Sequence, residues 1–322
     1  MNTGLRITVF AAALAATFGT AYGVGSGVGE ISPEPQRPAH EKHATAPHGE
    51  HRGASQAPAE PPGGLQISDR GYTLDLKTPA IAAGKGTNLR FAVVQDATGR
   101  ALTAYQQEHT KELHLIIASR DLTVYRHLHP ARAADGTWST PVKLPKAGAY
   151  RVFADFTPRG GEGLTLGADL TASGAYESVP LPAPDTTAEV DGYEVSLQGG
   201  LTPAKGSELT LTVTRNGKPV RDLQPYLGAY GHLVALRSGD LAYLHVHPGG
   251  EPGDGTTRPG PDISFTATAP STGTYRLFLD FKHAGEVHAA AFTVRADEPA
   301  KRADASKAAS APPPEKQSGH TH

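Results

Sequence analysis

The sequence predicts an all-β protein built from two tandem β-sandwich domains. The chain has 322 residues, which is the length of two domains of ordinary size. It contains 37 glycines and 27 prolines, and this composition favours short strands joined by turns over long helices. An internal duplication, together with strand-like alternation of apolar and polar residues, supports the same fold class.

The duplication is visible in four pairs of segments that occur in the same order. The longest pair is "HLIIASRDLTVYRHLHP" (114–130) and "HLVALRSGDLAYLHVHP" (232–248), which align without a gap. The other pairs are "GYTLDL" (71–76) with "GYEVSL" (192–197), "AGKGTNLRFAV" (83–93) with "PAKGSELTLTV" (203–213), and "AGAYRVFADF" (147–156) with "TGTYRLFLDF" (272–281). A repeat of this length indicates two copies of one domain.

Each copy contains short alternating segments of the kind that form half-buried strands. Examples are "ELTLTVT", "YRLFLDF" and "EVHAAAFTV", and "RNGK" (215–218) is a strong hairpin turn signal. Seven or eight short strands in about 110 residues indicate an immunoglobulin-like sandwich.

The predicted domain organisation follows from changes in composition along the chain. We expect the segments on either side of the sandwiches to be disordered, because they are rich in Pro, Ala and charge and lack apolar periodicity. The predicted boundaries are an N-terminal hydrophobic segment (1–29), a Pro- and His-rich linker (30–64), the first sandwich (65–178), a linker (179–188), the second sandwich (189–296) and a tail (297–322).

The N-terminal segment predicts a location outside the cytoplasm. Arg6 precedes an uncharged run of 23 residues, "ITVFAAALAATFGTAYGVGSGVG" (7–29). The run has the features of a signal peptide cleaved after Ala21 or Gly23, and it is also long enough for a transmembrane anchor. Both alternatives leave the two sandwiches extracytoplasmic, either secreted or held at the membrane through this segment alone.

Composition also narrows the chemistry and the partners of the chain. The net charge of −2 argues against a nucleic-acid partner, because phosphate binding needs concentrated positive charge. The chain has no cysteine, and its one methionine is Met1, so thiolate and thioether metal sites are excluded. Metal ligands would have to be imidazoles and carboxylates, which suit Zn(II), Cu(II) or Ni(II).

The duplicated segment predicts a hairpin with three histidines on one face. A turn centred on "SRDL" or "RSGD" pairs His114 with His127 and His232 with His245. His129 and His247 lie two residues further along the same face. The opposite face is expected to join the core through Leu113, Leu115, Ile117, Val124 and Leu128, and in the second copy through Leu233, Ala235, Leu244 and Val246.

Other residues could complete a metal site or orient its ligands. Asp155 and Asp280 occupy equivalent strands, and either could bind a metal or orient an imidazole. The second copy adds His283 and His288, whereas the first has His109 before its hairpin. The second copy is therefore the favoured metal site, with His232, His245 and His247 as ligands and Asp280 or His288 as a fourth. The equivalent candidates in the first copy are His114, His127 and His129.

Three functions are consistent with these histidines. The first is a non-enzymatic metal-binding protein for Cu(II) or Zn(II), acting in metal homeostasis. The second is a structural or protein-interaction module whose His and Asp side chains form hydrogen-bond networks without metal. The third is a metal-dependent enzyme; the sequence has no nucleophile elbow, paired acid–base carboxylates or phosphate loop, and we predict no enzyme. Further histidines in the predicted flexible segments could collect divalent metal weakly: His40, His43, His48, His51, His320 and His322.

The motifs "HLIIASRDLTVYRHLHP" and "PYLGAYGHLVALRSGDLAYLHVHP" resemble those of secreted or membrane-anchored actinobacterial proteins. Those proteins carry hairpins of the His-Leu-His-Pro type in immunoglobulin-like domains, and the resemblance covers residues 65–296 without implying an established activity. More loosely, the chain resembles CopC-type and YtkA-like extracytoplasmic β-sandwich domains. This second resemblance implies metal handling outside the cytoplasm, with copper as one candidate. The chain departs from the CopC pattern because no histidine lies at a plausible mature N-terminus.

Overall fold

Alternation of side chains explains why these segments form strands, and β14 (Gly206–Arg215) is a clear example. Ser207, Leu209, Leu211 and Val213 are buried, whereas the intervening residues are partly or fully exposed. This period of two places one face of the strand on a core and the other towards solvent.

The computed structural model describes residues 61–244 and 246–297, and these residues form strands and no helix. The N-terminal hydrophobic segment and the C-terminal tail lie outside the described residues, apart from Asp297.

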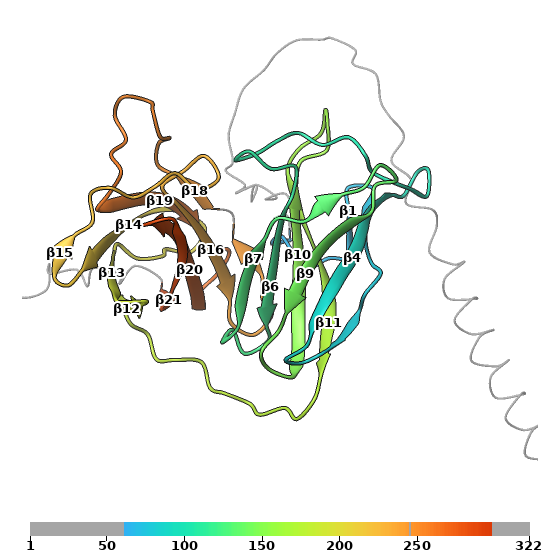
Figure 1. Ribbon diagram of the computed structural model, residues 1–322, viewed down its shortest axis with the longest axis horizontal. Helices are drawn as coiled ribbons and strands as arrows, with labels where there is room; N and C mark the ends of the chain where they lie inside the picture. Colours follow the sequence, from blue (N-terminus) through green and yellow to red (C-terminus); the bar gives the residue numbers. More distant parts are fainter. Residues whose placement is uncertain (1–60, 245, 298–322) are drawn as a thin grey trace, which may run out of the picture. The chain divides into compact units, whose positions relative to one another are not determined.

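The first sandwich consists of two sheets (Figure 1). One has the order β1-β2-β4-β9-β8, with β5 paired to β4: β1 (Ser68–Asp69), β2 (Tyr72–Leu76), β4 (Gly86–Gln95), β5 (Arg100–Ala101), β8 (Ala131–Arg132) and β9 (Trp138–Lys143). The other has the order β3-β11-β10-β6-β7: β3 (Ala80–Ala82), β6 (His114–Ser119), β7 (Tyr125–Leu128), β10 (Gly148–Phe156) and β11 (Leu164–Ser173).

The second sandwich repeats this arrangement. One sheet has the order β12-β13-β14-β19-β18, with β15 paired to β14: β12 (Thr187–Val190), β13 (Tyr193–Gln198), β14, β15 (Lys218–Pro219), β18 (Val246–Pro248) and β19 (Asp262–Thr268). The other has the order β17-β16-β20-β21: β16 (Gly231–Arg237), β17 (Tyr243–Leu244), β20 (Gly273–His283) and β21 (Glu286–Ala296).

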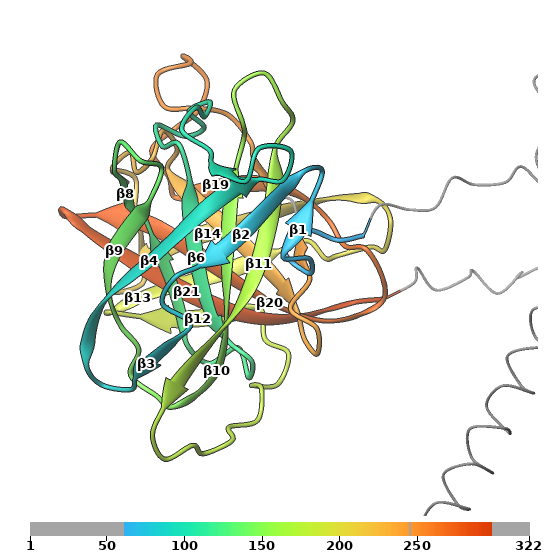
Figure 2. The ribbon, with the colours of Figure 1, turned by 90° about the vertical axis from the view of Figure 1, so that its right-hand side faces the viewer.

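This strand order confirms the predicted pair of immunoglobulin-like sandwiches. In the first copy, β2-β4-β9-β8 follow the A-B-E-D order of one immunoglobulin sheet, and β6-β10-β11 follow the C-F-G order of the other. The equivalent strands of the second copy are β13-β14-β19-β18 and β16-β20-β21. Figure 2 shows the strands of both copies from a second direction.

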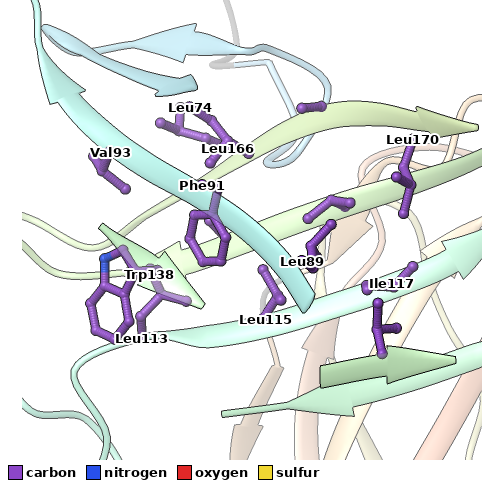
Figure 3. Close-up of a cluster of buried hydrophobic side chains, with 14 of the residues drawn as sticks. Leu74, Leu89, Phe91, Val93, Leu113, Leu115, Ile117, Trp138, Leu166 and Leu170 are labelled. Atoms are coloured by element: carbon purple, nitrogen blue, oxygen red, sulfur yellow. The ribbon is translucent and has the colours of Figure 1, made fainter. Parts of the chain in front are cut away.

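Each sandwich has a separate apolar core between its two sheets. In the first core, Leu89, Phe91 and Val93 of β4 belong to the same buried cluster as Leu115 and Ile117 of β6 (Figure 3). Each fully buried side chain of this size contributes about 1.5–3 kcal/mol of hydrophobic stabilisation. The predicted core face of the hairpin is confirmed: Leu113, Leu115, Ile117 and Val124 are buried in this core and Leu128 packs against it, and in the second core Leu233, Ala235 and Leu244 are buried with Val246 packed against them.

A tyrosine at the start of an F strand closes the corner of each sandwich. The Tyr150 hydroxyl donates to the Lys146 carbonyl at 2.7 Å, and the Tyr275 hydroxyl donates to the Ser271 carbonyl at 2.8 Å. Both bonds span four residues, the geometry of the tyrosine corner in immunoglobulin sandwiches. Since the sequences "AGAYRVF" and "TGTYRLF" are equivalent, the duplication has retained this device in both copies.

The predicted hairpin register is wrong by two residues. In the first copy Leu115 pairs with Leu128 and Ile116 pairs with His127, whereas the turn centred on "SRDL" would pair His114 with His127. The turn lies one residue later because the Ser119 hydroxyl accepts the Val124 amide hydrogen at 2.9 Å. The second copy shows the same shift, since Ala235 pairs with Leu244. A shift of two residues keeps every side chain on its predicted face.

Removing either corner hydroxyl should destabilise its sandwich by about 0.5–1.5 kcal/mol, because one intramolecular hydrogen bond is lost. We therefore expect Tyr150→Phe and Tyr275→Phe each to lower the free energy of unfolding measured by urea titration. Tyr176→Phe is the matched control, since that side chain is 56% exposed. Corner variants as stable as Tyr176→Phe would contradict this assignment.

Candidate functional site

The strand β6 is buried on both of its faces, which is unusual for a sandwich strand with one face on a core. Leu115 and Ile117 face the core of the first sandwich, whereas Ile116 and Ala118 face a different cluster. That cluster contains residues of both sandwiches, and we call it the seam. Its buried members are Ile116, Ala118, Leu122, Tyr125 and Phe153 of the first sandwich and Val234, Leu236, Leu241 and Phe278 of the second.

The two halves of the seam are made by equivalent positions of the duplicated sequence. Tyr125 stacks on Phe278 with ring centroids 4.2 Å apart and an interplanar angle of 4°. When the two sandwiches exchange roles, the equivalent pair is Tyr243 of the second and Phe153 of the first, whose ring centroids are 5.6 Å apart. The two copies therefore pack through the same face, as the subunits of a two-fold symmetric dimer do.

A cluster of histidines lies beside the seam, on the same face of β6 as Ile116. One ring nitrogen from each of His114, His127 and His129 lies within 4.8 Å of the other two. We call these three residues the triad; their ring centroids are 5.4 Å, 5.4 Å and 4.8 Å apart. His232 of the second sandwich adds a further ring, 6.2 Å from His114 and 6.0 Å from His127.

Hydrogen bonds assign the tautomers of two triad members. His127 Nδ1 lies 2.8 Å from the Asp280 carboxylate, so this nitrogen carries a hydrogen and donates it. His114 Nε2 lies 3.2 Å from the Glu108 carbonyl, so this nitrogen also donates. In the neutral imidazoles the remaining nitrogens, His127 Nε2 and His114 Nδ1, are acceptors, yet they face each other at 3.1 Å. Two facing lone pairs repel unless a proton or a metal ion lies between them.

Asp280 connects the triad to the second sandwich. Its carboxylate is 3% exposed and accepts hydrogen bonds from His127 and from the Tyr125 hydroxyl, the latter at 2.9 Å. Burial, together with the Asp280 charge, raises the pKa of Tyr125, so its phenol remains a hydrogen-bond donor. Both donors belong to the first sandwich and the acceptor to the second, so this polar contact crosses the seam.

The remaining triad residue has a buried nitrogen without a partner. His129 Nε2 forms no hydrogen bond within the described residues. Burial lowers the pKa of His129 to about 3, and the neighbouring His127 acts in the same direction. Burial likewise lowers the pKa of His114 to about 4 and that of His232 to about 3. These three imidazoles are neutral near pH 7, which is the form that binds metal.

Comparison with known families assigns the chain by its repeated unit. A family described as Domain of unknown function (DUF8832) matches two segments, residues 66–174 and 188–298. The chain belongs to this family. The two matches correspond to the two sandwiches, and a search of curated proteins gives no match.

Several solved bacterial structures are similar to the pair of DUF8832 domains. The adhesin FdeC of Escherichia coli is 18% identical, over 71% of this chain and 65% of that one, with a TM-score of 0.23. The adhesin InvE of Yersinia pseudotuberculosis is 11% identical, over 71% and 60%, with a TM-score of 0.23. A putative membrane anchored protein of Corynebacterium diphtheriae is 9% identical, over 72% and 60%, with a TM-score of 0.22. The chain thus spans about three fifths of the length of these structures.

The first DUF8832 domain, not the favoured second one, has the assembled triad. In the second domain, His245 lies outside the described residues, and His247 belongs to β18, which pairs with β19 in the other sheet. The chain therefore leaves the sheet of His232 before His247. The corresponding switch in the first domain follows His129, at β8, so its three histidines stay together.

His288 and His283 lie apart from the triad, at another part of the second DUF8832 domain. His288 pairs with Phe281 across β20 and β21, so it points to the opposite face of the sheet from Asp280. Its Nδ1 lies 2.9 Å from the Asp191 carboxylate. His283 bonds to the Tyr193 hydroxyl at 2.6 Å and to Asp222 at 3.1 Å. His288, one of the two predicted fourth ligands, is therefore not placed to act with the triad.

The aspartates serve different partners in the two DUF8832 domains. Asp280 was expected to bind a metal or orient an imidazole, and it contacts an imidazole of the other domain. Asp155 accepts a hydrogen bond from the Thr165 hydroxyl at 2.8 Å.

Sequence reasoning missed Tyr125, the seam and the approach of His232 to the triad. One signal for the seam was present in the sequence. The segment "HLIIAS" has apolar residues at both odd- and even-numbered positions, as expected of a strand that is buried on both faces.

The cluster borders a pocket of about 780 Å³ whose lining includes His109, His114, His127 and His232. His109 contributes a ring 5.2 Å from that of His232. Among the predicted residues, Asp155 and His247 also line this pocket.

Within residues 61–244 and 246–297, no helix is long and apolar enough to cross a membrane.

The buried histidines predict acid sensitivity in chelator-treated protein. The pKa values of His114 and His232 are lowered from 6.5 to about 4 and about 3, so below pH 6.5 the unfolded chain binds protons that the folded chain does not. Stability is therefore fully present above pH 6.5 and falls as the pH is lowered towards 4. The slope is up to about 1.4 kcal/mol per pH unit for each histidine.

Urea titrations at a series of pH values measure this slope. His114→Gln and His232→Gln should each reduce it, whereas the control His283→Gln should not. A slope that is unchanged in both cluster variants would contradict the assignment of neutral buried imidazoles.

Proposed function

We propose that this protein is a non-enzymatic, extracytoplasmic metal-binding protein that holds one Zn(II) or Cu(II) ion at the triad. His114 Nδ1, His127 Nε2 and a nitrogen of His129 would be the ligands. The extracytoplasmic location is supported by the hydrophobic run at 7–29, whether it acts as a signal peptide or as an anchor.

The unpartnered nitrogen of His129 is the observation that carries this proposal. A buried polar atom without a partner costs about 1–3 kcal/mol, and such atoms are rare in folded proteins. One ring nitrogen of His129 lies within 4.8 Å of one from each of His114 and His127. His114 Nδ1 and His127 Nε2 themselves face each other at 3.1 Å. A cation bound by all three residues would relieve this lone-pair repulsion, and ligation through His129 Nε2 would also give that atom a partner.

The distance between two of the ligand nitrogens and the spacing of the three rings are close to those of a shared ion, while the three nitrogens as a set lie within 4.8 Å of one another. Zinc–nitrogen bonds of 2.0–2.1 Å at a tetrahedral angle put two ligand nitrogens about 3.3 Å apart. The 3.1 Å separation between His114 Nδ1 and His127 Nε2 is close to this value. The ring-centroid separations of 4.8–5.4 Å match the roughly 5 Å that the same geometry requires.

The surroundings of the triad also resemble those of metal sites. Metal-bound histidines donate their second ring hydrogen to a carboxylate or a backbone carbonyl, which fixes the tautomer. Asp280 does this for His127 and the Glu108 carbonyl does it for His114. Imidazole ligands without thiolate suit Zn(II) and Cu(II).

A second candidate function is a structural or protein-interaction module without metal. The buried contact between His127 and Asp280 favours it, because a doubly protonated His127 would donate to both Asp280 and His114. A proton would then occupy the position that we assign to the metal. This alternative leaves His129 Nε2 without a partner.

Replacing a triad histidine should abolish tight metal binding. The starting protein is the full chain with alanine at the six histidines of its flanking segments, which we call the tail variant: His40, His43, His48, His51, His320 and His322. We expect the tail variant to retain one Zn(II) or Cu(II) per chain after dialysis against a weak chelator. His114→Ala, His127→Ala and His129→Ala in this background should each lower the affinity at least about 100-fold, since each removes a direct ligand.

His283→Ala is the matched control for these variants, because it removes a partly buried histidine outside the triad. A tail variant that binds no metal, or triad variants that bind as tightly as the control, would refute the proposed site. If addition of a chelator also left the stability unchanged, the metal-free module would be the function that remains.

Asp280→Asn should weaken metal binding without abolishing it. The amide cannot provide the carboxylate that holds His127 Nδ1–H, and loss of such a partner typically costs 10–100-fold in affinity. Competition titration with a zinc chelator in the tail variant measures the change, and Asp222→Asn, at an exposed carboxylate that pairs with His283, is the control. An affinity equal to that of the control would mean that Asp280 does not orient a ligand.

A further inference from the structure

We propose that His232 of the second DUF8832 domain is the fourth ligand of the triad's ion, so that the metal links the two tandem domains. This inference rests on the proposed metal function and deepens it. A site confined to the triad would stabilise one domain, whereas a site that includes His232 couples the metal to the contact between the domains.

The position of His232 is the first reason for this assignment. Its ring centroid lies 6.0 Å from that of His127 and 6.2 Å from that of His114. Four imidazoles around one tetrahedral ion have centroids about 5 Å apart. The two measured separations exceed this value by about 1 Å, so ligation would bring the His232 ring about 1 Å closer to His114 and to His127.

The hydrogen bonding of His232 is the second reason. Its Nε2 donates to the Tyr226 carbonyl at 2.8 Å, which assigns Nδ1 as the acceptor in the neutral ring. His114 is held in the same way by the Glu108 carbonyl at 3.2 Å. His114 and His232 are equivalent in the duplicated sequence, as are Glu108 and Tyr226. Both copies thus use one backbone device that leaves Nδ1 as the metal-binding atom.

Other donors near the triad are less well placed for this role. His109 is exposed, and its ring lies beside His114 and His232, 6.2 Å and 5.2 Å away. The Glu108 carboxylate accepts from the Thr157 hydroxyl. Asp280 is already engaged by Tyr125 and His127. His232 is partly buried and adjacent to two triad members.

Because His232 lies on β16, an ion bound to it would connect the two domains. His232 pairs with Asp280 of β20, so ligand and orienting carboxylate lie on neighbouring strands of one sheet. An ion bound to His232 and to β6 and β7 connects that sheet directly to the first domain. Because the four-ligand site forms only when both domains are docked, the part of the binding free energy that His232 contributes adds to the stability of the seam.

The affinity test uses Zn(II) and the tail variant with and without His232→Ala. We expect His232→Ala to weaken Zn(II) binding at least about 10-fold, because one of four direct ligands is lost while the three triad imidazoles remain to hold the ion. His109→Ala is the matched control, because it removes the neighbouring imidazole of the cluster. X-ray absorption of the zinc-loaded tail variant should show four imidazole ligands, and that of His232→Ala should show three. The absorption measurement on the unmutated cluster does not depend on how the variant folds.

Hydrogen exchange measured by mass spectrometry tests the link between the domains. Zn(II) should slow exchange in peptides from β6 and β7 and also from β16. In His232→Ala the protection of β6 and β7 should persist, and the protection of β16 should be lost. Unchanged exchange in β20 and β21 without metal would show that the variant is folded.

The outcomes separate this inference from the proposed function. Triad variants that lose zinc, with a His232→Ala variant that matches the His109→Ala control and a site of three imidazoles, would overturn the inference and leave the function in place. Triad variants that keep zinc would overturn the function itself. Loss of affinity and of β16 protection in His232→Ala, with four imidazoles in the parent protein, would support both.

Discussion

The arrangement of the two DUF8832 domains depends on the buried carboxylate of Asp280. An ionised carboxylate removed from water costs several kcal/mol unless it is paired or hydrogen-bonded. Asp280 belongs to the second domain, and its hydrogen-bond donors Tyr125 and His127 belong to the first. A docked arrangement that buried Asp280 without these two partners would leave its charge uncompensated, so the contact favours this arrangement over other ways of packing the two domains. The same contact fixes the tautomer of His127 and aims its other nitrogen at His114.

The seam and the approach of His232 to the triad are two consequences of one duplicated strand. The residues of β6 alternate between the domain core and the seam, and β16 does the same in the second copy. His114 and His232 lie at equivalent ends of these strands, so packing the copies face to face brings the two histidines near each other. Duplication of one histidine-bearing strand therefore creates a cluster that a single copy does not contain.

The two copies have nevertheless taken different roles. In the first, β7 stays in the sheet of β6 through Leu128, and His127 and His129 remain beside His114. In the second, β17 ends at Leu244 and β18 joins the opposite sheet, which takes His247 away from His232. The first copy thus supplies the triad, and the second supplies Asp280 and His232. This difference lies in where one strand changes sheets, a property that the shared hairpin motif does not reveal.

The sequence by itself determined the duplication, the sandwich class, and the face on which each hairpin residue lies. These properties follow from local periodicity: an alternation of two places Leu115 and Ile117 on one face and His114 on the other wherever the turn falls. Only the tertiary structure decided the register, because the turn depends on the bonds of Ser119 and on the positive φ of 56° at Leu122. It alone also brought Asp280 to His127 and His232 to the triad. Those residues are more than 100 positions apart, and their proximity results from the packing of one domain on another.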